Sequence, residues 1–302
     1  MNSTNTVYLI DASIYIFKYY FSLPDNWWSK EDYPTAAVYG YTHWLFRFLK
    51  ASRPDYVAAC FDESLENCFR NEIYPAYKSS RALPDESLAF QLEACKQITE
   101  LLGIATYASD KYEADDLLGT LALRCRQKGH NIAILTRDKD LSQLLEGEQE
   151  AIWDYPDGDK LDRVAVMKKF GVMPEHLADY LALVGDKIDD IPGVPGLGPK
   201  GAAALISELG SWAKMKVRVP EVAQLKIRGA KALALKLTEH SEQIDMALKL
   251  SRIVCNAPLG RRYKITRGNI NYNDLIRFGR HLGFGSRFET SVNNLKNELT
   301  KN

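Results

Sequence analysis

The sequence predicts an α/β protein with a largely parallel sheet, followed by a second, mainly helical unit. In the first half, short β-type runs alternate with segments whose apolar residues recur at helical spacing. From about Val164 onward the β-type signal fades and helical periodicity dominates. A chain of 302 residues is also long enough for one large domain or two modest ones.

The predicted strands of the first unit are short and apolar. They are Val7–Ile10, Tyr56–Phe61 and Asn131–Leu135, with Ala151–Trp153 as a further candidate. Because helical segments separate these strands, each crossover returns the chain to the same end of the sheet, and this favours parallel pairing. Ligands of such sheets bind at the carboxyl ends of the strands.

The predicted helices are amphipathic segments that end near glycine or proline. In the first unit they are Ala36–Leu49, Leu88–Leu102 and Ala114–Arg126. In the second unit they are His176–Val184 and Gly201–Leu209, with one more helix in the stretch DLIRFGRHLGF. The glycine-rich and proline-rich segment between His176–Val184 and Gly201–Leu209 predicts a tight, exposed turn.

The charge of the chain is balanced overall but unevenly distributed. Lys+Arg and Asp+Glu number 39 each, whereas Ile191–Ile270 contains fourteen basic and five acidic residues. That excess favours a polyanion-binding unit, although a solvated basic surface has the same composition. The five cysteines form no CxxC pair and indicate free thiols in a reducing cytosol. The sequence shows neither a signal-peptide pattern nor an apolar run of membrane-spanning length.

Nine acidic residues in five short clusters are the candidate metal ligands. They are Asp11, Asp62, Glu113, Asp115, Asp116, Asp138, Asp140, Asp186 and Asp189. Most of them close apolar runs, and parallel strands would bring them to one edge of the sheet. Carboxylates gathered there repel each other unless they are solvated, paired or neutralised by a cation. Mg²⁺ suits this place, because it binds through carboxylates, water and substrate phosphate.

Each acidic cluster taken alone has a second explanation. Acids such as Glu113 and Asp116 in a first helical turn complement the helix dipole, although three acids in four residues exceed that need. The acids of TRDKDL also fit an ordinary polar loop. At the carboxyl end of a helix the dipole disfavours Asp186 and Asp189, so an external cation is favoured there.

The segment GVPGLGPKG is typical of a helix–hairpin–helix that binds a nucleic-acid backbone. Gly193, Gly196 and Gly198 allow the backbone to approach a phosphate closely, and the start of the next helix supplies N–H donors. Lys200 adds positive charge at the same place. Such an element contacts the backbone without reading bases. The other reading of these letters is a simple turn between packed helices.

The segment FRNEIYPAYKSSR is the candidate phosphate-binding element. Pro75 suits the first position of a helix, on which Lys78 and Arg81 would share a face. With Tyr74 and Tyr77 interleaved, the segment fits a site that holds a phosphate and stacks unpaired bases. A solvated basic helix fits the same letters.

Together these motifs resemble the 5′-nuclease (flap endonuclease) family, in particular the 5′→3′ exonuclease domain of bacterial DNA polymerase I and related phage 5′ nucleases. LIDAS, FDES, YKSSR, YEADD, TRDKDL and GDKIDDIPGVPGLGPKGAA occur in the family's order from Val7 to about Phe288. The resemblance implies a PIN-like three-layer α/β/α domain at residues 1–175, with a helical arch at about 66–90. It also implies a helical domain at residues 176–302 that contains the helix–hairpin–helix (H3TH) motif.

The resemblance also assigns roles to individual residues. Asp11, Asp62, Glu113, Asp115 and Asp116 match the acids around a first metal, and Asp138, Asp140, Asp186 and Asp189 match those around a second. Lys78, Arg81 and Arg70 match catalytic basic residues. Lys18, Tyr74, Tyr77, Gly193, Gly196, Gly198 and Lys200 are the expected DNA contacts. The hairpin is also an expected K⁺ site.

The implied function is a 5′→3′ exonuclease and 5′-flap endonuclease that uses Mg²⁺ or Mn²⁺. The expected substrate is DNA with a free 5′ end at a single-strand/duplex junction, in replication and repair. We further expect a cytoplasmic monomer that works with a DNA polymerase or ligase. The alternatives are a PIN-class ribonuclease, which would lack the hairpin, and a non-catalytic DNA-binding protein, against which the intact acids and Lys78 argue.

Overall fold

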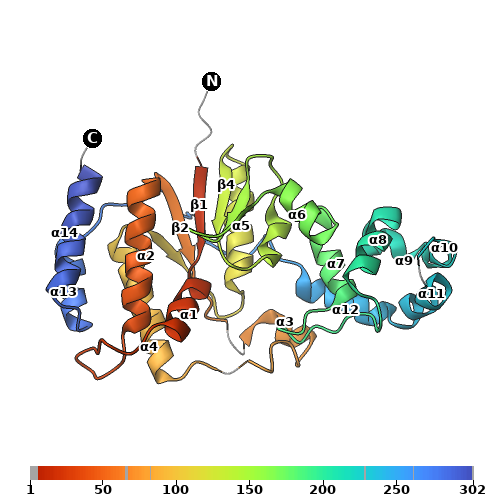
Figure 1. Cartoon of the computed structure of the whole chain (residues 1–302), viewed down its shortest axis with the longest axis horizontal. Coiled ribbons are helices and arrows are strands. Elements are labelled where there is room, and N and C mark those ends of the chain that lie inside the picture. Colours follow the sequence, from red (N-terminus) through yellow and green to blue (C-terminus); the bar gives the residue numbers. More distant parts are fainter. Residues whose placement is uncertain (1–5, 65–66, 82, 228, 261, 301–302) are drawn as a thin grey trace.

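The protein is elongated, with a helix-flanked sheet in the middle and a helical unit at one end (Figure 1). The computed structural model describes residues 6–64, 67–81, 83–227, 229–260 and 262–300. Within these ranges, none of the helices is both long and apolar enough to cross a membrane. All five cysteines are free, as predicted.

The first unit is built on a six-stranded sheet. Its strands are β1 (Thr6–Asp11), β2 (Tyr56–Cys60), β3 (Ala105–Tyr107), β4 (Asn131–Leu135), β5 (Ala151–Trp153) and β6 (Lys160–Leu161), in the order β3-β2-β1-β4-β5-β6. Every neighbouring pair is parallel except β5 with β6. The predicted class and all four predicted strands are therefore confirmed. Sequence reasoning missed β3 and β6, which are too short to show a periodic pattern.

Helices cover both faces of this sheet. On one face lie α1 (Ala12–Ser22), α2 (Ala36–Ser52) and α4 (Glu86–Leu101), and on the other lies α5 (Ala114–Arg126). Successive residues of β1 point to opposite faces, so Ile10 joins the first core whereas Val7 and Leu9 join the second. These three layers agree with the expected α/β/α architecture.

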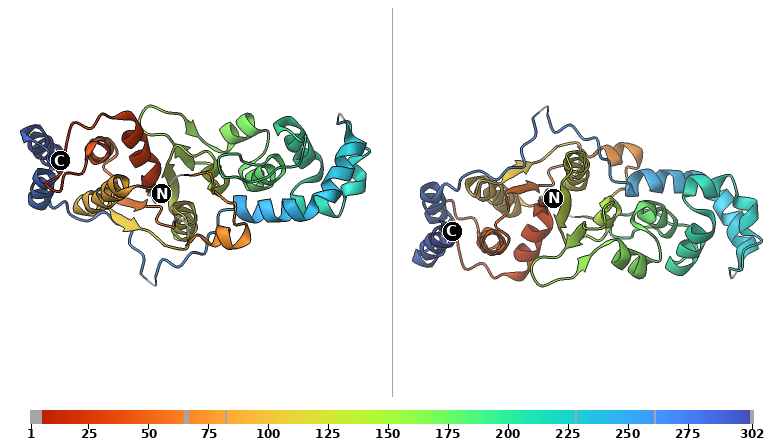
Figure 2. Two further views of the ribbon diagram at one scale, coloured as in Figure 1. Left: turned by 90° about the horizontal axis from the view of Figure 1, so that it is seen from below. Right: turned by 90° about the horizontal axis from the view of Figure 1, so that it is seen from above.

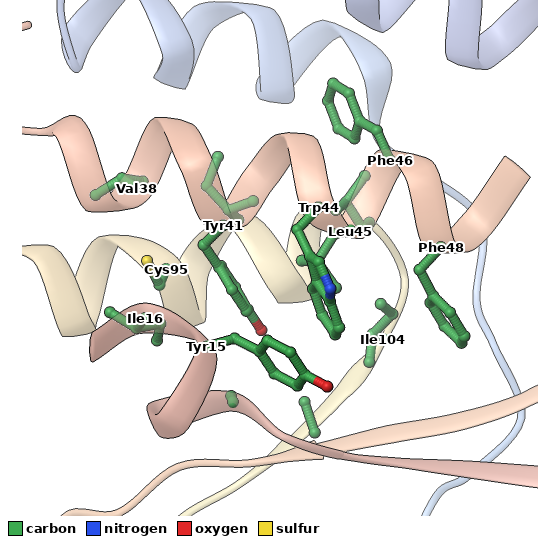
Figure 3. Close-up of a cluster of buried hydrophobic side chains, with 14 of the residues drawn as sticks. Tyr15, Ile16, Val38, Tyr41, Trp44, Leu45, Phe46, Phe48, Cys95 and Ile104 are labelled. Atoms are coloured by element: carbon green, nitrogen blue, oxygen red, sulfur yellow. The ribbon is translucent and has the colours of Figure 1, made fainter. Parts of the chain in front are cut away.

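The core between α1 and α2 fixes the end of β1. Tyr15 of α1 stacks on Trp44 of α2 with ring centroids 4.1 Å apart (Figure 3). The indole Nε1 of Trp44 donates to the carbonyl of Tyr155 at 2.9 Å, so its buried polar atom is satisfied. Because α1 begins directly after Asp11, this packing also holds the carboxylate that closes β1.

The second unit is helical and has its own core. It contains α7 (Leu177–Val184), α8 (Pro199–Leu209), α9 (Trp212–Lys216), α10 (Val219–Val222), α11 (Ala230–Glu239) and α12 (Ser241–Ser251). Trp212 lies at the centre of this core and is only 1% exposed. Between the two units lie α6 (Arg163–Phe170) and the 3₁₀ helix η3 (Pro174–His176).

The C-terminal helices do not belong to the second unit. Helices α13 (Tyr272–His281) and α14 (Ser286–Thr300) return to the opposite end of the molecule (Figure 2). There Leu275, Phe288 and Val292 join the core that contains α2 and α4. The expected helical domain at residues 176–302 is therefore corrected at its C-terminal end, because residues 272–300 pack with the first unit.

The segment that carries Lys78 is not helical at Lys78 itself. Helix α3 (Phe69–Ile73) is short, residues 75–80 form consecutive turns, and α4 starts only at Glu86. The helix predicted from Pro75 is thus wrong. Among the described residues of the arch expected at about 66–90, only α3 and the start of α4 are α-helical. Residues 66 and 82 of that range lie outside the described residues.

Candidate active site

Acidic residues from both units line one small cavity of about 30 Å³. They are Glu113, Asp115, Asp138, Asp140, Asp186 and Asp189. The first two lie at the start of α5, the next two at the start of the 3₁₀ helix η2 (Asp140–Leu144) after β4, and the last two follow α7. A cavity of this volume holds a group of the size of a water molecule or an ion, but no nucleotide. A larger substrate therefore has to approach from the rim.

The two remaining strand-end acids, Asp11 and Asp62, do not line this cavity, but their charges interact with those of Asp138 and Glu113, which do. Hydroxyl groups hold both residues. The Thr136 hydroxyl donates to Asp11 Oδ2 at 2.8 Å and accepts from the Asp138 backbone N–H at 2.9 Å. Ser13 Oγ accepts from the Asp62 backbone N–H at 2.9 Å. Sequence reasoning did not single out Thr136 or Ser13, although both adjoin predicted acids in the LIDAS and TRDKDL motifs.

Burial and mutual repulsion raise the pKa values of the clustered acids. Burial is the main cause that raises the pKa of Asp11 to about 7 and that of Asp140 to about 8, and the charge of Asp138 adds to both. Burial followed by the charges of Asp138 and Asp11 also raises the pKa of Asp115 well above its ordinary value. The cluster thus has an excess of negative charge that a cation would relieve.

Glu113 has a different environment because two basic side chains contact it. Arg70 Nη1 lies 2.8 Å from Glu113 Oε2, and Lys78 forms an ion pair with Glu113 Oε1. Although burial opposes its ionisation, Lys78 and Arg70 hold the pKa of Glu113 below its ordinary value. Glu113 is therefore the carboxylate that links the acidic cluster to the basic residues.

Arg70 is a buried structural residue in this conformation. Its side chain is 2% exposed, and its nitrogens donate to Glu113, to both oxygens of Asp116, and to the carbonyls of Leu250 and Arg252 at 2.7–3.0 Å. The expectation that Arg70 contacts the scissile phosphate is corrected, because its N–H groups are already committed.

Asp116 is better explained as a supporting residue than as one of the candidate metal ligands. It is fully buried, and both of its carboxylate oxygens accept hydrogen bonds from Arg70. The backbone N–H of Val254 donates to Oδ1 at 2.8 Å, and that of Glu113 donates to Oδ2 at 3.2 Å. These four bonds leave little capacity for a cation.

Lys78 and Arg81 lie at the acidic cluster and form ion pairs with it. Lys78 Nζ pairs with Glu113 and lies 3.8 Å from Asp189 Oδ2, and Arg81 pairs with Asp189 Oδ1. The Lys78 side chain is 18% exposed and that of Arg81 48%. Although burial opposes its charge, Glu113 holds the pKa of Lys78 well above its ordinary value. Both residues can thus present positive charge beside the cavity.

The tyrosines of this segment are less accessible than predicted. Tyr77 is 4% exposed and packs in the core of the second unit, while its hydroxyl donates to Glu113 Oε2 at 3.0 Å. Its expected role in base stacking is corrected, because the ring has no free face for a base. Tyr74 is half-buried against the same core. Lys18, on α1, places its ammonium 5.8 Å from the Tyr19 ring centroid.

The glycine hairpin borders a groove of about 910 Å³ between α8 and α11. Gly196, Gly198 and Lys200 line it together with Lys226 and Lys236. Gly196 has a φ of +78°, a conformation that favours glycine, and a Cβ at Gly198 would meet nothing within 4 Å. The exposed hairpin and its lysines fit the predicted contact with a phosphate backbone.

Gly193 serves packing rather than ligand approach. A Cβ at this position would lie 2.1 Å from the carbonyl oxygen of Val184, so only glycine lets the hairpin pass α7 this closely. The expected contact between Gly193 and DNA is therefore replaced by a structural role, whereas Gly196 and Gly198 remain exposed.

Three successive hairpin carbonyls already have donors from the chain itself. The Gly193 carbonyl accepts from Gln243 Nε2 at 3.0 Å, the Val194 carbonyl from the Leu197 N–H at 3.0 Å, and the Pro195 carbonyl from Lys236 Nζ at 2.7 Å. The residues present thus fit poorly with a K⁺ held by these carbonyls, because the Lys236 ammonium supplies a positive charge there.

The acidic cavity, by contrast, fits hard divalent cations. Among the described residues, no three acidic, histidine or cysteine side chains stand close enough to form a ready ligand set. Mg²⁺ does not need one, because it binds through one or two carboxylates and completes its shell with water and substrate phosphate. The raised pKa values of Asp11 and Asp140 show where the uncompensated charge lies.

Comparison with protein families matches nearly the whole chain. Residues 6–171 match the model of the 5′-3′ exonuclease N-terminal resolvase-like domain, and residues 172–271 match that of the 5′-3′ exonuclease C-terminal SAM fold. The chain is 35% identical over 250 residues to a 5′-3′ exonuclease of Aquifex aeolicus, covering 80% of this chain and 84% of that protein.

DNA polymerase I of Pseudomonas aeruginosa is 34% identical over 278 residues, which are 91% of this chain and 30% of that protein. Among solved structures, T5 5′-exonuclease with bound zinc aligns over 98% of this chain and 100% of that chain, with 17% identity and a TM-score of 0.64. The catalytic core of Rad2 in complex with DNA substrate aligns over 98% and 93%, with 16% identity and the same TM-score. These structures confirm the fold.

Proposed function

Because the chain belongs to the 5′-3′ exonuclease family, we propose that it hydrolyses DNA phosphodiester bonds as a divalent-metal-dependent 5′→3′ exonuclease and 5′-flap endonuclease. Its substrates would be flapped, nicked or gapped duplexes with a free 5′ end, in replication and repair. The observation that carries the proposal is a cavity that acids of both units line together, with Lys78 beside it.

Mg²⁺ or Mn²⁺ is the proposed cofactor. Asp11, Asp62 and Asp115 would hold the first ion, and Asp138, Asp140, Asp186 and Asp189 the second, directly or through water. When bound, a pair of such ions supplies an activated water and stabilises the leaving oxygen of an in-line displacement. Asp116 acts on this site through Arg70 and through the Glu113 backbone N–H, and both contacts keep Glu113 in place.

Lys78 and Arg81 are the groups proposed to bind the scissile phosphate. Their charged nitrogens lie at the edge of the acidic cavity, where a phosphate that enters from the rim would arrive. Neither residue needs to transfer a proton, because positive charge alone stabilises the developing negative charge on the phosphate. Binding a phosphate there requires Lys78 to exchange its ion pair with Glu113 for a contact with the substrate.

The proposed duplex contact lies on the second unit. Gly196, Gly198 and Lys200 present backbone N–H groups and positive charge along the groove, to which Lys226 and Lys236 add. Binding through backbone contacts should be independent of sequence and should weaken steeply with salt. The protein is further proposed to act as a cytoplasmic monomer alongside a DNA polymerase or ligase.

The proposal predicts cleavage of 5′-flap DNA that depends strictly on added divalent cation. Labelled 5′-flap, nicked, gapped and blunt duplexes would be incubated with Mg²⁺, with Mn²⁺ and with EDTA, beside an RNA of the same sequence. We expect cleavage of the DNA junctions in both metals and none in EDTA. DNA binding without cleavage in either metal would instead indicate a non-catalytic binding protein, and preferential cleavage of RNA would indicate a PIN-class ribonuclease.

Duplex binding is expected to depend little on the alkali ion, because Lys236 supplies a positive charge at the hairpin. Replacing KCl by LiCl at equal concentration should change the Kd of a nicked duplex by less than about twofold, measured by anisotropy in EDTA. Lys236→Met should weaken binding in LiCl and recover part of the loss in KCl. Lys231→Met, at an exposed position of the same helix, is the control and should show no preference for K⁺. Strong K⁺ dependence of the unsubstituted protein would restore the expected K⁺ site.

A further inference from the structure

Lys78 adopts a backbone conformation that its own residue type does not favour. Its φ is +53°, in the left-handed region. A non-glycine residue in this region is strained and persists only when its surroundings fix it. Lys78 lies within consecutive turns at residues 75–80, so no helix determines its direction. We call residues 75–81 the Lys78 turn.

From the first unit, the Lys78 turn is held by Asn71 of α3 and by Glu113 at the start of α5. Asn71 Nδ2 donates to the carbonyl of Tyr77 at 2.9 Å, directly before the strained residue. The Tyr77 ring is buried in the core of the second unit, and its hydroxyl donates to Glu113. One end of the turn is thus fixed between the two units.

From the second unit, the Lys78 turn is held by the loop after α7. Asp186 and Ile191 close this loop through reciprocal backbone hydrogen bonds of 2.9 and 2.7 Å. The Asp189 carbonyl accepts from the Lys78 N–H at 3.1 Å, and Asp190 Oδ2 accepts from the Ser80 N–H at 2.9 Å. Asp189 and Asp190 therefore bind the backbone N–H groups of Lys78 and Ser80, the residues on either side of Ser79.

Asp190 differs from the neighbouring acids in what its carboxylate does. It does not line the acidic cavity, and it has a left-handed φ of +56° itself. That conformation directs its carboxylate to the backbone of Ser80 instead of the site of Asp186 and Asp189. An acid beside two proposed metal ligands is thus used as a hydrogen-bond acceptor for the segment that carries the proposed phosphate-binding residues.

We propose that Asp190 is a positioning residue that sets the direction of Lys78 by binding the backbone of the Lys78 turn. The inference rests on the proposed nuclease function and deepens it. Because the loop of Asp190 leads directly into the glycine hairpin, it also connects the duplex-binding element to the phosphate-binding one. Asp190 acts through Lys78, and it touches neither substrate nor metal.

The test compares Asp190→Gly with Asp190→Asn. Glycine tolerates φ = +56° and removes only the side-chain acceptor, whereas asparagine tolerates the same φ, keeps an acceptor oxygen and removes the charge. On a 5′-flap substrate in Mg²⁺, D190G should lower kcat roughly tenfold to a hundredfold, the range expected for a lost hydrogen bond to a charged group. KM and the Kd for duplex in EDTA should change less than about threefold, and D190N should restore kcat to near the unsubstituted value.

A double-mutant cycle shows whether Asp190 acts through Lys78. In a Lys78→Ala background, measured by single-turnover cleavage at high enzyme concentration, D190G should cause no further loss. Independent losses that multiply, or a D190N variant as slow as D190G, would overturn the proposal. If D190G proves poorly folded by circular dichroism, Asn71→Ala loosens the same turn from the other side and should give the same non-additivity with K78A. An unsubstituted protein that cleaves no DNA would instead reject the underlying nuclease function.

Discussion

Replacing Asp138 with asparagine is expected to lower turnover of a 5′-flap substrate by more than about 100-fold. Asp138 lines the acidic cavity, and its charge acts on Asp11, Asp115 and Asp140. Asparagine retains an oxygen that can accept the 2.8 Å hydrogen bond from the Asp140 N–H, so the local turn should persist. Loss of turnover can then be attributed to the missing charge, and duplex binding on the second unit should be unchanged.

The same substitution should stabilise the protein in EDTA. Asp11 and Asp140 have folded-state pKa values of about 7 and about 8, above their ordinary value of 3.8, mainly through burial and in part through Asp138. Between pH 3.8 and these raised pKa values, the two carboxyl groups bind more protons in the folded state than in the unfolded state. The free energy of unfolding therefore falls as pH rises from about 4 to 8. Removing the Asp138 charge weakens this fall. At pH 8 the Tm of D138N should exceed that of the unsubstituted protein by at least about 2 °C.

Cleavage assays and thermal melts at pH 5 and pH 8 check both parts of this prediction. Asp25→Asn, at an exposed position after α1, is the matched control and should change neither quantity. Turnover within tenfold of the unsubstituted protein would remove Asp138 from the proposed metal site. A Tm gain that is equal at both pH values would show that repulsion among the acids is not its cause.

The convergence of the acids could be predicted because it follows from topology. Parallel strands end at one edge of the sheet, so Asp11, Asp62 and Asp138 had to lie near each other once the strands were recognised. What each acid contacts could not be predicted in the same way. Glu113 and Asp116 share a helix face at i and i+3, yet one lines the cavity and the other is fully buried against Arg70. Only the tertiary position of α3 decides between these environments.

Long-range packing also explains the two errors in the fold. The apolar periodicity of α13 shows that one face is buried but not which core receives it, and this helix crosses to the first unit. The sequence around Lys78 suggested a helix because Pro75 and the spacing to Arg81 fit one. The turn found there depends on one hydrogen bond donated by Asn71 of the nearby helix α3 and on one accepted by Asp190, which is 110 positions away from Ser80, in the second unit.

Replacing Arg70 with methionine is expected to destabilise the protein by about 3–5 kcal/mol, the range for breaking a buried ion pair. Methionine fills a similar volume but provides no hydrogen-bond donor, so Glu113 and Asp116 would lose a buried cationic partner. The carbonyls of Leu250 and Arg252, which tie the second unit to α3, would lose their donors as well. Urea unfolding followed by circular dichroism measures this change.

A second substitution tests whether an unpaired buried carboxylate causes the destabilisation of R70M. If the cost comes from an unpaired buried carboxylate, adding Asp116→Asn to Arg70→Met should recover part of the lost free energy, although D116N alone destabilises. Arg47→Met is the control, because its ion pair with Asp157 is 61% and 80% exposed and should contribute less than about 1 kcal/mol. Near-native stability of R70M, combined with a loss of cleavage, would return Arg70 to the catalytic role that its sequence position suggested.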